Sequence, residues 1–265
     1  MKILYVGDVM GWVGIEVVEK VLPELRKKEK IDLVVAQAEN VTEGKGITPE
    51  DFARLRKAGV DFCTGGNWTT HRPQIFPALE NPDEPIIRPA NYPTDTPGLG
   101  YKYAASPAGK VLVVSLLGHI VGRDAEKPTD NPLKAIDKIL DQEKSVPKAA
   151  TVVNFHGDYS SEKLIIGYYL DGRVSAVIGD HWHVPTADAE VLPKGTAHIT
   201  DVGMCGSLDS SLGVKFESVI PRWLGNEKTP NELETTGRRQ FSALLIEVDP
   251  KTGLAKSTKH IRQVI

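Results

Sequence analysis

The chain has 265 residues, of which 40% are hydrophobic and 25% charged, and its formal net charge is −3 at pH 7. This length allows one large domain or two small ones, and the composition is ordinary for a globular protein. The small negative charge gives no general attraction to nucleic acid or to an anionic membrane. Since no stretch approaches 18 apolar residues and the first apolar run stops at Gly7-Asp8, neither a membrane span nor a signal peptide is predicted. We therefore expect a cytoplasmic protein without membrane contact or stable DNA binding.

The first 67 residues alternate between strand and helix patterns. Strands are predicted at residues 2–8 (KILYVGD), 31–40 (IDLVVAQAEN) and 60–67 (VDFCTGGN). Helical spacing of apolar residues follows the first strand up to the basic run RKKEK (26–30), and a second helix begins at Pro49, with Gly59 as its C′ residue. Strand–helix–strand repetition predicts an α/β fold with parallel neighbouring strands.

The rest of the chain continues the same pattern. A proline-rich connection (80–101) leads to buried strands at 111–119 and 150–156, with a helix near 131–143 between them. A helix with a weak cap signal is predicted at 160–172, and a strand at 174–184. Residues 241–249 and 255–265 predict an antiparallel hairpin across PKTG. Because no linker or internal repeat is visible, we expect a single domain spanning residues 1–265.

Polar side chains stand where five of the predicted strands end. They are Asp8, Glu39 with Asn40, Asn67, His156, and His181 with His183. A single strand-end Asp, Asn or His usually has a structural role. Ligands of α/β proteins, however, bind at the carboxyl ends of strands, so this set predicts one site at one sheet edge.

The donor types in this set indicate a metal site. Carboxylates, an amide and imidazoles suit Mn, Fe or Zn, and the absence of cysteine argues against a structural zinc. On an extended chain, H-x-H would direct His181 and His183 to the same face. One bridging carboxylate would allow two cations about 3.5–4 Å apart, the arrangement used for phosphoryl transfer.

The motifs GD, EN, GN, H and GDHWH, in this order, resemble those of the calcineurin-like metallophosphoesterases. Within that group, the chain resembles the YmdB-type bacterial family of 2′,3′-cyclic-nucleotide phosphodiesterases. Five longer stretches carry the resemblance over most of the chain: AENVTEGKGIT (38–48), RPANYPTDTPGLGY (88–101), NFHGDYSSEK (154–163), YLDGRVSAVIGDHWHVPTAD (169–188) and AHITDVGMCG (197–206). The fold that the resemblance implies is a sandwich of two mixed β-sheets flanked by α-helices.

The resemblance also implies a cofactor, a mechanism and a role for each residue of the site. Two divalent or trivalent cations (Fe, Mn or Zn) would be bound, the first by Asp8 and His183 with Asn40 nearby, the second by Asn67, His156 and His181, with Glu39 bridging them. A hydroxide held between the cations would attack a phosphodiester or nucleotide substrate. The resemblance suggests self-association as well.

The chain departs from the family pattern at three positions. The family motif GNH, whose His is taken to protonate the leaving oxygen, reads GNW here, and the Trp68 indole can donate a hydrogen bond but cannot deliver a proton. His71 or His119 could replace that acid. Asp180 and Trp182 stand where the family has small polar residues in G-T-H-T-H, which predicts an altered pocket wall.

Two functions therefore remain open on the sequence. The first is a metal-dependent phosphodiesterase whose activity is weakened or altered by Trp68. The second is a catalytically impaired regulatory protein that still binds metals and a nucleotide. A metal-dependent amidohydrolase or deaminase is disfavoured, because its H-x-H would be expected at the first strand, which here ends in Asp8.

Overall fold

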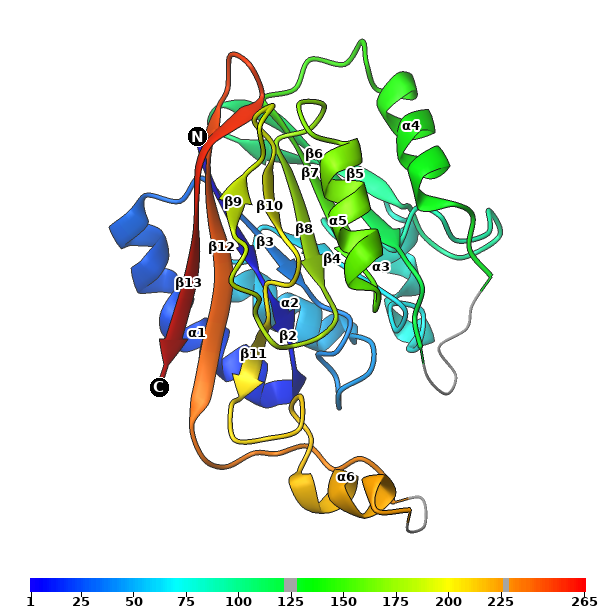
Figure 1. Cartoon of the computed structure of the whole chain (residues 1–265), viewed down its shortest axis with the longest axis vertical. Coiled ribbons are helices and arrows are strands. Elements are labelled where there is room, and N and C mark those ends of the chain that lie inside the picture. Colours follow the sequence, from blue (N-terminus) through cyan, green and yellow to red (C-terminus); the bar gives the residue numbers. More distant parts are fainter. Residues whose placement is uncertain (122–127, 226–228) are drawn as a thin grey trace.

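The computed structural model describes residues 1–121, 128–225 and 229–265, and in this part of the chain the strands form two mixed sheets (Figure 1). The first sheet contains β1 (Lys2–Val6), β2 (Asp8–Val9), β3 (Leu33–Gln37), β4 (Phe62–Thr64), β11 (Met204–Ser207), β12 (Arg239–Asp249) and β13 (Leu254–Val264). The second contains β5 (Tyr101–Ser106), β6 (Gly109–Leu117), β7 (Ala150–His156), β8 (Ala176–Asp180), β9 (Glu190–Val191) and β10 (Ala197–Ile199).

The first sheet has antiparallel β12 in its middle and parallel pairs at both edges, whereas the second has a parallel centre and antiparallel edges. In the first sheet, β1, β3 and β4 are parallel neighbours, and the long β12–β13 hairpin joins antiparallel to β1. In the second, β6, β7, β8 and β10 run parallel, with β5 and β9 antiparallel at its two edges. Parallel strands end at the same side of a sheet, so the strand ends that carry polar residues are gathered together.

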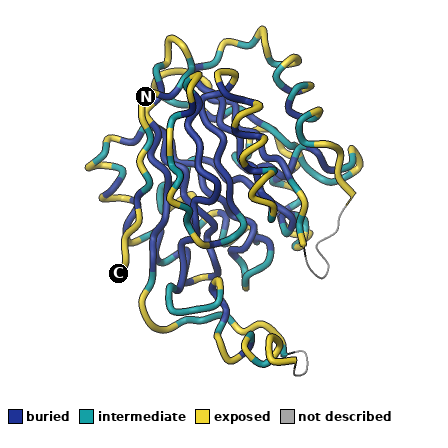
Figure 2. Tube along the Cα trace, in the orientation of Figure 1, coloured by how far each residue is buried: buried dark blue, intermediate teal, exposed yellow. Residues whose placement is uncertain are grey.

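The alternation of side chains along each strand builds three layers of core. Figure 2 shows that the central strands are buried along most of their length, while exposed residues lie mainly on helices, loops and chain ends. On β1, Ile3 and Tyr5 face the second sheet, whereas Leu4 and Val6 face the helices outside the first. The same period of two places Val152 between the sheets and Val153 against the outer helices. Because both faces of each sheet are covered, the central strands are buried almost throughout, as parallel strands usually are.

Helices cover the outer faces of the sandwich (Figure 1). Bounds in the described residues are α1 (Gly11–Glu29), α2 (Pro49–Lys57), η1 (Pro73–Ile75), α3 (Phe76–Glu80), α4 (Pro132–Gln142), α5 (Ser160–Tyr169) and α6 (Phe216–Trp223). The buried face of α1 packs on the first sheet, while α4 and α5 pack on the second. Among these helices of the described chain, none has the length and apolarity that crossing a membrane requires.

The structure confirms the α/β fold, its two mixed sheets and several local predictions. The β12–β13 hairpin crosses PKTG as expected, and α2 begins at Pro49 with the Thr48 side chain accepting a hydrogen bond from the Asp51 backbone. Gly59 adopts a φ of 105°, which suits a C′ glycine. The basic run at residues 26–30 is largely exposed at the end of α1.

One prediction about the site was wrong in its topology. The polar strand ends do not lie on one sheet edge, because β1 to β4 belong to the first sheet and β7 and β8 to the second. They meet because the two sheets pack face to face, and their parallel strands end at the same end of the sandwich. The site is therefore built between two sheets, and most of its side chains are buried.

Candidate metal centre

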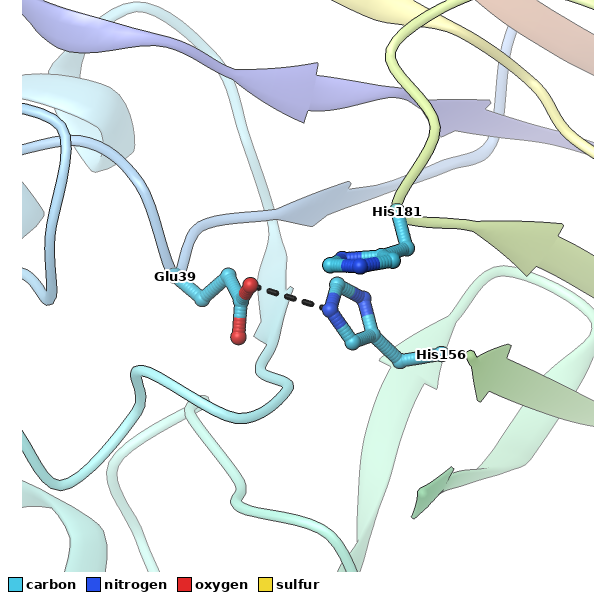
Figure 3. A group of neighbouring side chains, drawn as sticks. All are labelled: Glu39, His156 and His181. Atoms are coloured by element: carbon cyan, nitrogen blue, oxygen red, sulfur yellow. Dashed lines mark ion pairs between the residues drawn. The ribbon is translucent and has the colours of Figure 1, made fainter. Parts of the chain in front are cut away.

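Most of the predicted ligands are buried at this end of the sandwich, and His181 is partly exposed beside them. The buried ones are Asp8, Glu39, Asn40, Asn67, His156 and His183. Figure 3 shows the Glu39 carboxylate pointing at the His156 ring, with the His181 ring beside it. The structure thus brings together side chains that lie up to 175 residues apart in the sequence, counted from Asp8 to His183.

His156 lies at the centre of the cluster. Its Nε2 atom is 3.0 Å from Glu39 Oε1 and 2.9 Å from Asn67 Oδ1, and its ring centroid is 4.5 Å from that of His181. Possible ligand atoms of Glu39, His156 and His181 all lie within 4.8 Å of one another. A separation of this size allows one cation to contact all three.

Asp8 and His183 form the second part of the cluster. His183 donates from Nδ1 to the Leu212 carbonyl at 3.0 Å, which leaves its Nε2 lone pair directed at Asp8 Oδ2, 3.7 Å away. Asn40 points its amide nitrogen into the same space and donates to Asp8 Oδ1 at 3.1 Å. In this orientation Asn40 is a hydrogen-bond donor to the ligands, whereas Asp8 and His183 offer lone pairs.

The paired glycines before Asn67 are explained by close packing. A Cβ atom on Gly66 would collide with Glu39 Oε2 and with the His156 ring, and one on Gly65 would collide with the Thr69 side chain. Only glycine allows the backbone to pass between these groups. The chain can therefore present Asn67 and the backbone N–H of Trp68, which donates to Glu39 Oε2 at 2.9 Å.

The Asn67 amide has two competing orientations. In one, its oxygen faces His156 Nε2 and Glu39, as a metal ligand would. In the other, rotated by 180°, the oxygen accepts from the Trp68 indole N–H at 3.2 Å and the amide nitrogen faces Glu39 and His156. In the rotated orientation the Trp68 indole N–H therefore binds the Asn67 oxygen and turns it away from His156 and Glu39.

The predicted extended H-x-H was wrong. Strand β8 ends at Asp180, and His181 and His183 have φ values of 108° and 62°, outside the β region. The two rings therefore reach the cluster from a turn after the strand. The backbone N–H of Trp182, between the two histidines, donates to Asp201 Oδ2 at 2.8 Å and holds this turn.

Asp180 is a member of the buried cluster, not of the pocket wall that the sequence predicted. Its Oδ1 accepts a hydrogen bond from His156 Nδ1 at 2.7 Å. Its Oδ2 accepts three more, from the Tyr5 hydroxyl (2.9 Å), the Asn154 amide (2.6 Å) and the Gln37 amide (3.2 Å). A carboxylate on Nδ1 leaves Nε2 as the ligand atom of His156 and makes it more basic.

The alternation of inward-facing and outward-facing residues along β8 indicates this position of Asp180 from the sequence. Ala176 and Ile178 on β8 face the gap between the sheets, and with a period of two Asp180 faces the same way. The same parity directs Asn154 and His156 inward from β7, beyond Val152. The inward-facing end of both strands is therefore polar, which marks the point where the core gives way to the site.

We expect Asp180→Asn to weaken metal binding by about 10–100-fold, the usual effect of losing a partner behind a histidine ligand. The amide keeps the shape of the side chain but removes the charge that faces His156 Nδ1. Titration with Mn²⁺ followed by calorimetry measures this directly. Asp137→Asn, at a surface carboxylate paired with Arg173, is the control; equal affinity in both variants would contradict the role of Asp180.

A buried ion pair holds the turn that carries the two histidines. Lys163 Nζ lies 2.8 Å from Asp201 Oδ2, and both side chains are fully buried. Asp201 also accepts from the backbone N–H of Trp182 at 2.8 Å, and Lys163 lies over the Trp182 ring at 3.9 Å. The Trp182 indole in turn donates to the Asp158 carbonyl. Through these contacts Trp182 stabilises the turn that carries His181 and His183.

Lys163→Met should lower the free energy of unfolding by about 3–5 kcal/mol, because it leaves Asp201 as an unpaired buried charge. Urea unfolding followed by circular dichroism gives the value. The matched control is Lys144→Met, which removes an exposed partner of Asp141 and should change stability by less than about 0.5 kcal/mol. Similar losses in both variants would show that the Lys163 pair does not stabilise the turn.

The electrostatics of the cluster fit a cation. Burial raises the pKa of the Asp8 carboxyl well above its usual range, and the nearby Asp180 carboxylate raises it further. Burial opposes protonation of His156, but the carboxylates of Glu39 and Asp180 raise its pKa well above the usual value. In the described part of the chain, Asp8 Oδ2 accepts no hydrogen bond. A buried site with three carboxylates and an unsatisfied oxygen is suited to bind positive charge.

The pKa of His183 also suits a metal ligand. Burial lowers its pKa to about 4, and the neighbouring His181 contributes in the same direction. The imidazole is therefore neutral at pH 7, as a metal ligand has to be.

The two histidines considered as replacement acids lie outside this group. His71 is exposed and makes an edge-to-face contact with Trp68, with ring centroids 5.3 Å apart. His119 is exposed too, and its ring is paired with Glu162. The role of proton donor thus stays a prediction for either residue.

A two-sheet sandwich with these donors at its strand ends is a metallophosphoesterase fold, and comparison with known proteins places the chain within that class. Residues 4–261 match the family described as YmdB-like protein. The chain belongs to the YmdB-like family.

Three relatives illustrate the match. A 2′,3′-cyclic-nucleotide 2′-phosphodiesterase of Bacillus subtilis (strain 168) is 38% identical over 262 residues, which cover 98% of this chain and 96% of the relative. A solved structure described as a novel phosphatase from Mycoplasma pneumoniae has a TM-score of 0.91 at 31% identity and covers 100% of this chain and 93% of its own. A hypothetical protein from Thermus thermophilus has a TM-score of 0.89 at 35% identity, covering 100% and 99%. The chain is accordingly a metal-dependent hydrolase of the phosphodiesterase and phosphatase class.

Proposed function

We propose that this protein is a two-metal phosphodiesterase that hydrolyses 2′,3′-cyclic nucleotides. Trp68 stands in place of the family's acid, so protonation of the leaving oxygen is slowed. The observation that carries the proposal is the buried cluster around His156, in which Glu39, Asn67 and His181 converge. The B. subtilis relative is named for the same reaction. Two-metal sites of this kind are used for displacement at phosphorus.

In this proposal the donor set would serve two cations. Asp8 and His183 would hold one, while Asn67, His156 and His181 would hold the other, with the Glu39 carboxylate shared between them. Cations bound there would supply an activated water and neutralise charge on the phosphate oxygens. Mn²⁺, Fe and Zn²⁺ all accept this mixture of oxygen and nitrogen ligands.

The protein itself contributes the orientation of the ligands. Asp180 holds the His156 ring through Nδ1, and the Leu212 carbonyl holds the His183 ring in the same way. The Asn40 amide N–H points into the cluster beside Asp8, where it can donate to a phosphate oxygen. The Gly66 backbone keeps Glu39 and His156 in contact without an intervening side chain.

Proton delivery to the leaving oxygen is the weak part of the site. A ribose alkoxide leaves poorly without a proton, and general acid catalysis contributes about 10²–10⁴ in rate. The Trp68 indole N–H cannot supply a proton at ordinary pH. It donates instead to the Asn67 oxygen in one of the two amide orientations. Aryl diesters, whose leaving group is stable as an anion, should be far less affected.

Identification of the product tests the proposed reaction. Protein loaded with Mn²⁺ is incubated with 2′,3′-cyclic AMP, and the products are separated by chromatography. We expect slow, chelator-sensitive formation of a single isomer, adenosine 3′-monophosphate, the product of cleaving the bond to the 2′-oxygen. A failure to open the cyclic diester, in protein that cleaves bis-4-nitrophenyl phosphate, would restrict the function to other diesters.

The regulatory alternative is favoured by the same residue. Trp68 replaces the acid, and in one orientation of the Asn67 amide its indole N–H binds the Asn67 oxygen, as expected of a site that binds a nucleotide without turning it over. Metal and nucleotide binding without hydrolysis of either diester would support this alternative over the enzyme.

A further inference from the structure

A layer of polar side chains lies between the two sheets, where the apolar core meets the metal centre. Its members are Ser115, Asn154 and Asp180 from β6, β7 and β8, which lie side by side in the second sheet (Figure 1), and Tyr5, Gln37 and Thr64 from β1, β3 and β4 of the first. Each stands two residues beyond an apolar residue that faces the gap between the sheets, so each faces inward as well. All six are at most 1% exposed. Buried polar groups need hydrogen-bond partners, and those of this polar layer lead to two of the proposed metal ligands.

One path of hydrogen bonds through the polar layer passes through Ser115. Its hydroxyl lies 2.6 Å from the Gly65 carbonyl oxygen and 3.1 Å from Asn154 Oδ1, so two acceptors share the single hydroxyl hydrogen. The Asn154 amide donates to Asp180 Oδ2 at 2.6 Å, and Asp180 Oδ1 accepts from His156 Nδ1 at 2.7 Å. The path therefore joins the ring of His156 to the Gly65 carbonyl.

A second path passes through Tyr5. Its hydroxyl donates to Asp180 Oδ2 at 2.9 Å and lies 2.8 Å from Thr64 Oγ1. Because the Tyr5 hydrogen is used on Asp180, Thr64 is the donor of the second bond. Thr64 is the last residue of β4 and directly precedes Gly65. Both paths thus begin at Asp180 and end in the same short segment of chain.

This segment leads to Asn67 and has little stiffness of its own. Residues 65–66 are glycines, which restrict the backbone least. Ser115 binds the carbonyl of the first glycine, and the Thr69 hydroxyl donates to the carbonyl of the second at 2.7 Å. Beyond them, Asn67 Oδ1 lies 2.9 Å from His156 Nε2. The position of Asn67 relative to His156 therefore depends on side chains of the polar layer.

We propose that Ser115 and Tyr5 are positioning residues that set the separation of Asn67 and His156, and with it the affinity for the cation that these two ligands would share. The inference deepens the proposed function and rests on it for the division of ligands between two cations. Neither residue is a ligand in that division. Each acts through hydrogen bonds behind the ligands, and loss of such partners usually weakens metal binding about 10–100-fold.

The other proposed cation provides an internal reference. Its ligands Asp8 and His183 are held by the Asn40 amide and by the Leu212 carbonyl, which are not members of the polar layer. A change in the layer should therefore weaken one Mn²⁺ binding event and spare the other. A general loss of stability would weaken both.

Stepwise Mn²⁺ binding, measured by calorimetry, tests the inference. Ser115→Ala and Tyr5→Phe each remove one hydroxyl, and each should weaken one of the two binding events by about 10–100-fold while the other keeps the affinity of the parent. Thermal unfolding of each variant confirms that the protein is folded.

Two matched variants serve as controls. Ser175→Ala removes a buried hydroxyl just before β8 begins, at the opposite end of that strand from Asp180, where it accepts from the Thr151 backbone N–H at 2.9 Å. Tyr103→Phe removes a hydroxyl that donates to Glu143 at 2.7 Å. Both controls should keep both Mn²⁺ affinities of the parent, whatever stability they lose.

The outcomes separate this inference from the proposed function. If Ser115→Ala and Tyr5→Phe keep every Mn²⁺ affinity, or weaken both events equally, or lose no more than the controls, the positioning role is refuted. Hydrolysis of 2′,3′-cyclic AMP by the parent would still support the function in that case. If the parent cleaves no cyclic diester but both variants selectively lose one Mn²⁺, the positioning role stands and the phosphodiesterase function fails.

Discussion

Trp68→His is expected to increase the turnover of 2′,3′-cyclic AMP by about 10²–10⁴-fold, the usual value of a general acid. The substitution places an imidazole next to Asn67, at the point where the Trp68 backbone N–H already binds Glu39. Hydrolysis of bis-4-nitrophenyl phosphate should change little, because nitrophenolate leaves without protonation. Initial rates on both substrates with Mn²⁺-loaded protein measure the effect.

Trp68→Phe is the matched control for that experiment. Phenylalanine removes the indole N–H and thus the bond to the Asn67 oxygen, but it supplies no acid. A gain in metal affinity without a gain in cyclic-nucleotide turnover is expected. If Phe raises turnover as much as His, the indole inhibits by holding Asn67, and the missing acid is not what limits the rate.

Glu39→Gln should lower the rate on bis-4-nitrophenyl phosphate by about 10²–10³-fold, since metal ions contribute several kcal/mol to such reactions. Glu39 is the carboxylate that faces both His156 Nε2 and the Trp68 backbone. Replacing it with an amide removes the charge proposed to be shared by two cations. Kinetics in saturating Mn²⁺ and thermal unfolding of each variant give the rate and confirm that the protein is folded.

Glu43→Gln provides a carboxylate control from the same loop. Glu43 is exposed and paired with Arg72, so its loss should leave the rate within about twofold, as is usual for a surface substitution. A Glu39 variant that retained full activity would show that this carboxylate is not needed as a metal ligand. That result would contradict the proposed division of ligands between two cations.

Much of this site could be predicted because parallel strands end together. The strands that end near Asp8, Glu39, Asn67 and His156 were recognisable as buried runs, and the polar residue after each run was the functional signal. The family resemblance supplied the order of the motifs. The prediction of a two-sheet sandwich rested on it as well, since strand patterns do not reveal which strands share a sheet.

The rest depended on contacts that sequence patterns do not encode. The turn after β8 requires φ values of 108° at His181 and 62° at His183, which are unusual for residues other than glycine, so extended geometry was the natural expectation. Lys163 and Asp201 are 38 residues apart, and a buried lysine is rare, so no sequence pattern indicates that they pair. Asp180 stands out in the sequence as a departure from the family pattern. Its hydrogen bond with His156, however, depends on the pairing of β7 with β8, which the sequence does not reveal.

The central claim is that this buried cluster binds two cations, and the number of bound metal ions tests it most directly. The protein is dialysed to equilibrium against Mn²⁺, and bound metal is determined by elemental analysis alongside the Glu39→Gln variant. The account predicts two Mn²⁺ per chain in the parent protein and fewer in the variant. Folded parent protein that binds fewer than two, or a variant that binds as many as the parent, would contradict it.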